Sequence, residues 1–125
     1  MAAIHVLVLD EDPELVELTE TFLERNSDDL TVSTETDPET AIDRVVEEDV
    51  DCVVSDFRMP GMDGIELYEA MAEHRPELPF FLFTAADRGV ETAAAEAGIT
   101  GYVQKGSGTD HYEELAARIV DAVDA

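Results

Sequence analysis

Lysine is almost absent from this chain of 125 residues. The single lysine, Lys105, and six arginines face 31 aspartates and glutamates, so the formal net charge is −24 at pH 7. Phosphate backbones and anionic membrane surfaces repel such a protein, and we expect no direct nucleic-acid binding. Salt at ~1 M shortens the Debye length to roughly 3 Å and screens most of the self-repulsion. The composition therefore favours a halophilic protein over an acidic protein of ordinary salinity.

Long apolar runs and paired cysteines are also missing. The apolar run at residues 4–9 is far shorter than the ~20 residues of a membrane span, and no basic leader precedes it. Cys52 has no partner for an internal disulfide, and we expect a buried, inert thiol. We predict a cytoplasmic protein without membrane insertion. A hydrophobic content of 45% suffices for one core, and residues 1–125 are expected to form a single domain.

Short apolar runs alternate along the chain with longer amphipathic segments. Such runs suit strands of a parallel sheet that is covered on both faces. Three of the segments between them start with an aspartate typical of a helix N-cap, at Asp12, Asp37 and Asp63. The expected strands cover residues 4–9, 30–33, 51–55, 80–83 and 101–103. Five βα units, (βα)5, predict an α/β fold with a doubly wound five-stranded parallel sheet and right-handed crossovers.

Apolar stripes on the first two helices predict which of their faces are buried. The expected inward side chains are Leu15, Leu18, Phe22 and Leu23 in the first helix, and Ala41, Ile42, Val45 and Val46 in the second.

Polar side chains follow four of the predicted strands. Asp10 and Glu11 come after the first, Asp56 after the third, Thr84 after the fourth and Lys105 after the fifth. In a doubly wound sheet, ligands bind beyond the carboxyl ends of the strands, where these residues would meet. Carboxylates gathered there repel one another unless a cation lies among them. Mg²⁺ is suited to that place because it takes oxygen ligands from carboxylates, phosphate and water.

Each of these residues also has an ordinary interpretation. A strand-end carboxylate such as Asp56 can attack phosphorus and form an acyl phosphate, although an aspartate beginning a turn is common. Thr84 and Lys105 could bond phosphoryl oxygens, but either could be a plain surface residue. Asp10 could belong to a solvated acidic loop. Asp12 is best assigned to helix capping. The combination, rather than any single residue, favours phosphoryl chemistry.

Together these residues resemble the receiver domain of two-component response regulators, over essentially the whole chain. The resemblance is carried by residues 53–64 (VVSDFRMPGMDG), by residues 83–85 (FTA) and by residues 102–105 (YVQK). It implies a flavodoxin-like strand order, 2-1-3-4-5. It also implies a phosphorelay signalling switch that accepts a phosphoryl group from a sensor histidine kinase or a phosphotransfer protein. Catalysis would be limited to self-phosphorylation from phosphodonors and autodephosphorylation.

The same resemblance implies a magnesium site. Asp10, Glu11 and Asp56 match its carboxylate ligands, and the main-chain carbonyl of Arg58 completes the set. Glu11 departs from the family, which usually has aspartate there, so the metal would be held less rigidly or through water.

The resemblance further assigns the phosphoryl contacts and the switch. Asp56 is the expected phosphoacceptor, with Thr84 and Lys105 contacting the phosphoryl group. Tyr102 matches the aromatic residue that turns inward as Thr84 moves. The position after the lysine is often a proline preceded by a cis peptide bond, and here it is Gly106. Arg58 and Ala86 stand at the two positions that flank the attacking water, with an effect on lifetime that residue type does not predict.

Phosphorylation is expected to shift the population of two states of one face. Residues 88–97, 102–104 and 110–123 would form this surface for a downstream protein, and a homodimer is left open. A single-domain regulator and a piece of a longer protein are both compatible with the chain.

Two other functions remain as alternatives. A phosphatase of the haloacid-dehalogenase type would use Asp10 as nucleophile and Asp12 as general acid, but it needs an acidic pair after the lysine that this chain lacks. A receiver-like interaction module would never be phosphorylated. The populated site positions argue against that module.

Overall fold

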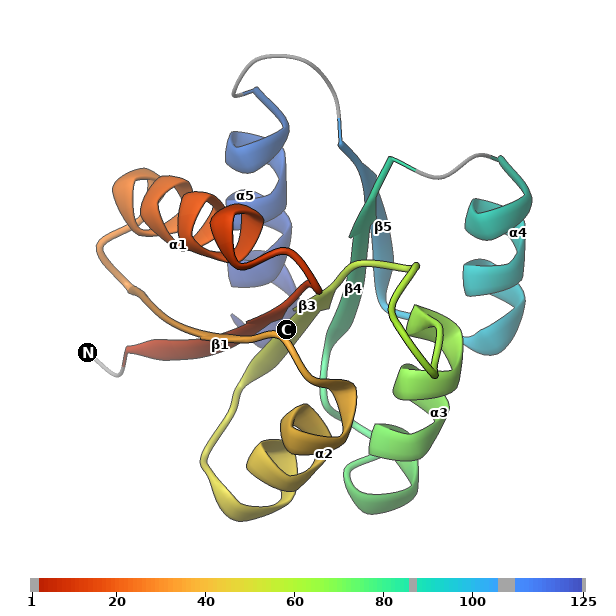
Figure 1. The fold of residues 1–125 in the computed structure, drawn as a ribbon. Coiled ribbons are helices and arrows are strands. Elements are labelled where there is room, and N and C mark those ends of the chain that lie inside the picture. The colour runs from red at the N-terminus through yellow and green to blue at the C-terminus, as the bar shows by residue number, and fades with distance from the viewer. Residues whose placement is uncertain (1–2, 86–87, 106–109, 125) are drawn as a thin grey trace.

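The computed structural model describes residues 3–85, 88–105 and 110–124 (Figure 1). Five parallel strands form one sheet in the order β2-β1-β3-β4-β5, and five helices cover it. The predicted α/β fold and strand order are therefore confirmed. The elements are β1 (Ile4–Leu9), α1 (Pro13–Asn26), β2 (Leu30–Glu35), α2 (Pro38–Glu47), β3 (Cys52–Ser55), α3 (Gly64–His74), β4 (Phe80–Thr84), α4 (Arg88–Ala97), β5 (Gly101–Gln104) and α5 (Asp110–Asp124).

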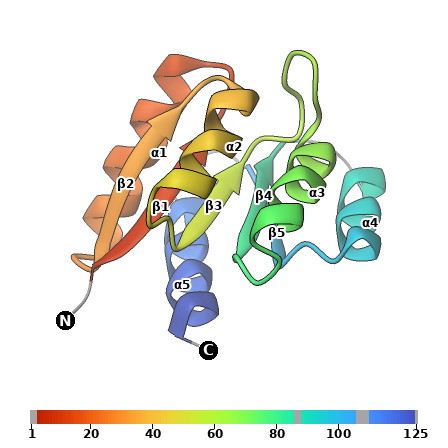
Figure 2. The same ribbon diagram turned by 90° about the horizontal axis from the view of Figure 1, so that it is seen from below.

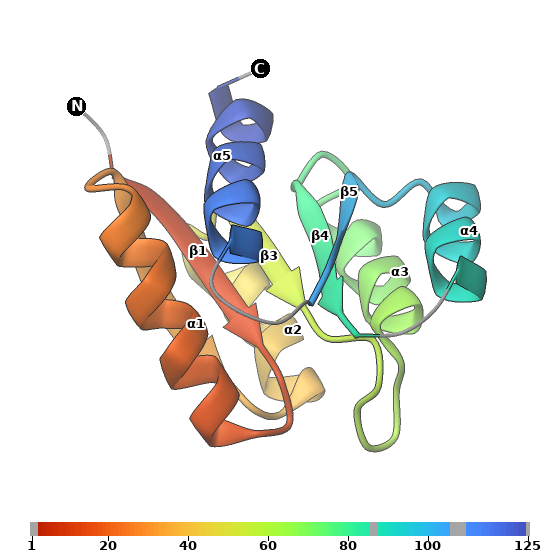
Figure 3. The ribbon, with the colours of Figure 1, turned by 90° about the horizontal axis from the view of Figure 1, so that it is seen from above.

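The sheet separates two apolar cores. Helices α1 and α5 lie over one face, and α2, α3 and α4 lie over the other (Figures 2 and 3). Successive side chains of a strand point to opposite faces, so β1 sends Val6 and Val8 to the first core and Leu7 and Leu9 to the second. Because both faces are covered, most strands are rich in apolar residues, as the sequence pattern indicated. The edge strand β2, with the sequence LTVSTE, is the exception.

The helix starts predicted from the sequence are confirmed. Asp12 accepts a hydrogen bond from the Glu14 backbone N–H (2.9 Å), and Asp37 accepts one from the Thr40 N–H. Asp63 forms a reciprocal capping box, in which its own carboxylate and that of Glu66 each bind the other's backbone N–H. These bonds satisfy donors that the first turn of a helix leaves unpaired.

Two predicted core positions are wrong. Leu18 is 44% exposed and Val46 is 51% exposed, and the buried side chains of α1 include Val16 and Thr19 instead. The buried face of α1 follows the spacing 16, 19, 23, which turns Leu18 outward. The face predicted from apolar residues alone differs from the buried face because Thr19, a polar residue, packs inward.

Strand lengths also differ slightly from the prediction. β2 continues to Glu35 because its backbone pairs with β1 all the way to Leu9, although its last side chains are polar. β4 and β5 each extend one residue further, to Thr84 and Gln104. Backbone pairing, which hydropathy does not report, sets these ends.

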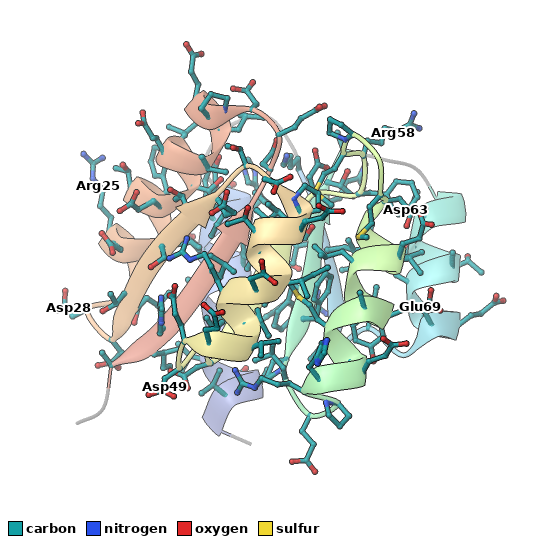
Figure 4. The ribbon with its side chains drawn as sticks, turned by 60° about the horizontal axis from the view of Figure 1, so that its bottom comes forward. Arg25, Asp28, Asp49, Arg58, Asp63 and Glu69 are labelled. Carbon is teal, nitrogen blue, oxygen red and sulfur yellow. The ribbon has the colours of Figure 1, made fainter. Side chains whose placement is uncertain are left out.

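Charged side chains lie mainly on the outside of the molecule. Figure 4 shows Arg25, Asp28, Asp49, Arg58 and Glu69 projecting away from the ribbon, and all five are exposed. Within the described ranges, no helix combines the length and the apolar character needed to cross a membrane.

Gly64 determines how the start of α3 meets the loop after β3. Its N–H donates to the Phe57 carbonyl (2.8 Å), which brings the two backbones together. A methyl group on Gly64 would lie 2.5 Å from Leu82 Cδ2 and 2.8 Å from the carbonyl oxygen of Asp56. Only glycine allows this approach without a shift of the backbone that carries Asp56.

We expect Gly64→Ala to lower the free energy of unfolding by about 1–3 kcal/mol, because the added methyl group overpacks the junction. Helix propensity alone would give the opposite sign, a gain of up to about 1 kcal/mol. Urea unfolding followed by circular dichroism measures the change. The exposed substitution Glu69→Ala on the same helix serves as control and should stay within about 0.5 kcal/mol. A stabilised Gly64→Ala variant would contradict the close approach.

Candidate functional site at the carboxyl edge of the sheet

The carboxyl ends of four adjacent strands bring the candidate residues together. Asp10 follows β1, Asp56 follows β3, Thr84 ends β4 and Lys105 follows β5. Backbone hydrogen bonds extend beyond the strands, from the Asp56 N–H to the Leu9 carbonyl (3.0 Å) and from the Lys105 N–H to the Thr84 carbonyl (2.9 Å). The four residues are thereby held on one rigid edge rather than on long loops.

Asp10 is a buried carboxylate, with 5% of the residue exposed. Its Oδ2 accepts a hydrogen bond from Lys105 Nζ at 2.9 Å, and its Oδ1 accepts one from the Asp12 N–H at 3.0 Å. A buried charge is tolerated only when it is paired and hydrogen-bonded, and both conditions are met.

Asp56 is more accessible than Asp10, with 17% of its side chain exposed. Its Oδ1 accepts the backbone N–H of Phe57 at 2.8 Å, which orients the carboxylate. Its Oδ2 lies 3.9 Å from Lys105 Nζ. An oriented, partly exposed carboxylate at a strand end is suited to attack an electrophile from solvent.

Lys105 places one ammonium group between the two carboxylates. Its side chain is 19% exposed, and its Nζ lies 5.5 Å from the centroid of the Phe83 ring. A lysine ammonium has three N–H donors, so it can bind an incoming anionic oxygen while it stays near the two carboxylates. The site thus carries a cation beside both carboxylates, where it can offset negative charge on a bound anion.

Thr84 and Tyr102 belong to β4 and β5, the two strands that lead to Lys105 and its neighbours. Thr84 is buried (3% exposed) at the last position of β4. Tyr102 of β5 is half-buried and packs against the core that α2, α3 and α4 cover. The Arg118 guanidinium donates to the Tyr102 carbonyl at 2.7 Å, so α5 is tied to this strand.

The donor chemistry of the site fits Mg²⁺. Asp10 and Asp56 supply carboxylate oxygens, and Mg²⁺ is usually bound by one or two carboxylates with water and phosphate. Glu11 and Arg58 are exposed. No group of three or more histidine, cysteine, aspartate or glutamate side chains is arranged to hold a metal among the residues with described positions. The structure therefore brings Asp10 and Asp56 together but leaves the Glu11 side chain apart from them.

The sequence interpretation missed Phe83 as a neighbour of the site. Strand alternation offered the signal, because Phe83 and Val103 are register partners on one face, and Lys105 lies two residues after Val103. Gly106, the departure after the lysine, and Ala86, one of the two positions expected to flank the attacking water, fall outside the described residues.

Comparisons with known proteins place this chain in a family. The family model of the response regulator receiver domain matches residues 6–118. The chain is 32% identical, over 126 residues, to a protein-glutamate methylesterase/protein-glutamine glutaminase of Bdellovibrio bacteriovorus, with 98% of this chain and 36% of that protein covered. It is 28% identical, over 102 residues, to response regulator SaeR of Staphylococcus aureus, with 81% of this chain and 43% of that protein covered. The chain thus spans less than half the length of these relatives.

Solved structures show the same fold. The response regulator domain of Thermotoga maritima CheB superimposes with a TM-score of 0.86 at 20% identity, covering 98% of each chain. A CheY-like response regulator receiver domain protein of Methanospirillum hungatei gives a TM-score of 0.83 at 20% identity, again over 98% of each chain. At this identity the likeness concerns the fold alone.

We expect Lys105→Met to lower the free energy of unfolding by about 1–3 kcal/mol, because Asp10 would remain buried without its cation. Adding Asp10→Asn should recover part of the loss, since the double variant buries no unpaired charge. Urea unfolding of the wild type, both single variants and the double variant forms a double-mutant cycle. Additive effects would contradict the coupling of these two side chains.

Proposed function

Because this chain belongs to the response regulator receiver domain family, whose members are phosphorelay signalling switches, we propose that it accepts a phosphoryl group on Asp56. The observation that carries the assignment is the unequal environment of the two aspartates. Asp10 is buried and committed to Lys105, whereas Asp56 is oriented by one backbone N–H and is more exposed. Asp56 is therefore the carboxylate that a phosphodonor can reach.

The transfer needs few parts. A carboxylate oxygen of Asp56 attacks phosphorus, the P–N bond of a phosphohistidine or the P–O bond of a small donor breaks, and its electron pair leaves with the donor. Lys105 and the Thr84 hydroxyl are assigned to the phosphoryl oxygens, where they would offset their negative charge. Mg²⁺, held by Asp10, Asp56 and the Arg58 carbonyl, with Glu11 taking part through water, would supply further charge neutralisation.

The partners follow from the family. A sensor histidine kinase or phosphotransfer protein would supply the phosphoryl group in the cytoplasm. A downstream protein would read the surface of α4, β5 and α5, where α4 and α5 both contact β5 (Figure 3). Inward rotation of Tyr102 would shift the population of two states of that surface, and a second copy of the chain is an alternative partner for it.

We assign no catalysis beyond self-phosphorylation and autodephosphorylation. The Bdellovibrio relative is named for methylesterase and glutaminase activities, but this chain covers 36% of it. A phosphatase that attacks through Asp10 is the less favoured function, because the side chain of Asp10 is 8% exposed, against 17% for Asp56, and is paired with Lys105.

Acetyl phosphate with Mg²⁺ should add one phosphoryl group to the wild type and none to Asp56→Asn, because the amide is not a nucleophile. Intact-mass spectrometry in concentrated salt measures the adduct. The exposed substitution Asp28→Asn is the matched control and should be labelled like the wild type. Label that persists on Asp56→Asn would point to Asp10 and the hydrolase. Unlabelled, folded wild type would favour an interaction module instead.

We also propose that the protein works in concentrated salt, as in a halophile. Like charges already crowd one another on α1. Slight burial raises the pKa of Glu20, and the neighbouring carboxylates of Glu24 and Glu17 raise it further. Glu48 shows the opposite effect, because a hydrogen bond from Arg44 lowers its pKa. Glu20 thus destabilises the folded protein at neutral pH, whereas Glu48 contributes stability that is lost as pH falls through its folded pKa.

The free energy of unfolding should rise between 0.1 M and about 1 M KCl as repulsion is screened. At low salt, Glu20→Gln should raise it by about 0.2–0.5 kcal/mol, and the gain should shrink at high salt as the repulsion by Glu24 and Glu17 is screened. Urea unfolding at pH 7 gives both values. Glu48→Gln is the control of opposite sign and should lose stability at low salt. A free energy that stays flat with KCl would contradict the proposal.

A further inference from the structure

Four rings from three elements form a continuous series inside the core between the sheet and helices α1 and α5. Phe22 of α1 stacks on Tyr112 of α5, with centroids 4.9 Å apart and planes 11° apart. Tyr112 also contacts His111 (4.3 Å) and Phe83 of β4 (5.6 Å), and His111 lies 5.4 Å from Phe83. We call Phe22, Tyr112, His111 and Phe83 the ring series.

The ring series ends at the side chain of Lys105. Phe83 is 3% exposed, and its ring centroid lies 5.5 Å from Lys105 Nζ, within the range of a cation–π contact. The register explains the meeting. Phe83 pairs with Val103 on the face that α5 covers, and Lys105 points to that same face two residues later.

A charge effect agrees with this geometry. Burial lowers the pKa of His111, Asp110 opposes the change, and the ammonium of Lys105 lowers it further. The charge of Lys105 is therefore felt at α5.

The other end of the ring series reaches the surface. Phe22 and His111 are half-buried, whereas Tyr112 between them is buried at 6% exposure. Arg25 lies over the outer part of the series, with its guanidinium carbon 5.7 Å from the Phe22 centroid. The series thus connects the α1–α5 surface with the carboxyl edge of the sheet.

We propose that the ring series positions Lys105, so that Phe83, Tyr112 and Phe22 are positioning residues for phosphoryl transfer. The ammonium has three competing neighbours: the Asp10 carboxylate, the Asp56 carboxylate and the Phe83 ring. The ring limits where the lysine stem can lie, and Tyr112 limits where the ring can lie. The effect on phosphoryl transfer rests on the role proposed above for Lys105, but the contact by which the rings hold the lysine side chain does not.

The coupling runs in both directions. An ammonium that moves toward a phosphoryl oxygen on Asp56 changes its contact with Phe83, and Tyr112 and Phe22 must then adjust. Because coupling is reciprocal, a shift of Phe22 changes the balance between the two positions of the Lys105 ammonium by the same free energy. The α1–α5 surface would thereby sense phosphorylation by a route separate from Tyr102.

The single lysine makes a direct test simple. Protein grown with lysine labelled with ¹³C at Cε gives one ε-methylene signal, which belongs to Lys105. In the wild type we expect that signal to be displaced by the ring current of Phe83, compared with free lysine. Phe83→Leu should abolish the displacement, and Tyr112→Leu should change it in part.

Matched variants separate positioning from simple loss of packing. Tyr112→Phe keeps the ring and should give the wild-type signal. Phe22→Leu, at a half-buried position, should shift the signal without unfolding the protein. Leu18→Ala, on the same helix but outside the series, should leave it unchanged. A signal without ring-current displacement, or one that Tyr112→Leu and Phe22→Leu both leave in place, would overturn the proposal.

The effect on chemistry is measured separately by the initial rate of adduct formation with acetyl phosphate and Mg²⁺. Removing the Phe83 ring should slow it about threefold to tenfold, as expected for the loss of a partly desolvated cation–π contact. Tyr112→Leu should slow it less, and Tyr112→Phe should not. A wild type that gains no phosphoryl adduct would contradict the proposed function, but the ¹³C signal of Lys105 would still test whether the ring series positions the lysine. Normal rates in both leucine variants would overturn the role in transfer.

Discussion

The candidate site depends on one ion pair, between Lys105 and Asp10, that joins residues 95 positions apart at 2.9 Å. The two residues follow β5 and β1, which are not neighbours, since β3 and β4 lie between them. The contact forms only if all four strands end at the same level and the sheet twists as it does. Burying such a pair costs desolvation that its attraction barely offsets, so its presence argues for function more than for stability.

Three of the six arginines also bind groups at the sheet. Arg44, Arg75 and Arg118 donate to the main-chain carbonyls of Thr34, Val50 and Tyr102, respectively. Each of those carbonyls lies in a strand or next to one. Backbone acceptors removed from water need a donor, and a guanidinium reaching over from a helix or a loop provides it. In a chain this acidic, three of the six arginines are thus placed where the sheet meets its surroundings.

Much of the fold could be predicted because local signals agreed with one another. Asp12, Asp37 and Asp63 marked helix starts that the structure confirms, and the apolar runs located all five strands. Parallel strands then required Asp10, Asp56, Thr84 and Lys105 to share one edge. What failed depended on tertiary contacts. The buried Thr19 displaced the core stripe of α1, and the neighbourhood of Phe83 and Lys105 needed two strands in register before it could be seen. The position of the Glu11 side chain, exposed and apart from Asp10 and Asp56, follows from no sequence pattern.

In a protein with one lysine, every reaction of an ε-amino group takes place at the same residue, here Lys105. Acylating reagents, aldehydes and lysine-directed transferases find a single ε-amino group in this sequence, and it is 19% exposed and engaged with Asp10. Acylation there would remove the positive charge and leave the buried carboxylate without its partner. Damage that other proteins spread harmlessly over many surface lysines would here act as an all-or-none loss of the site.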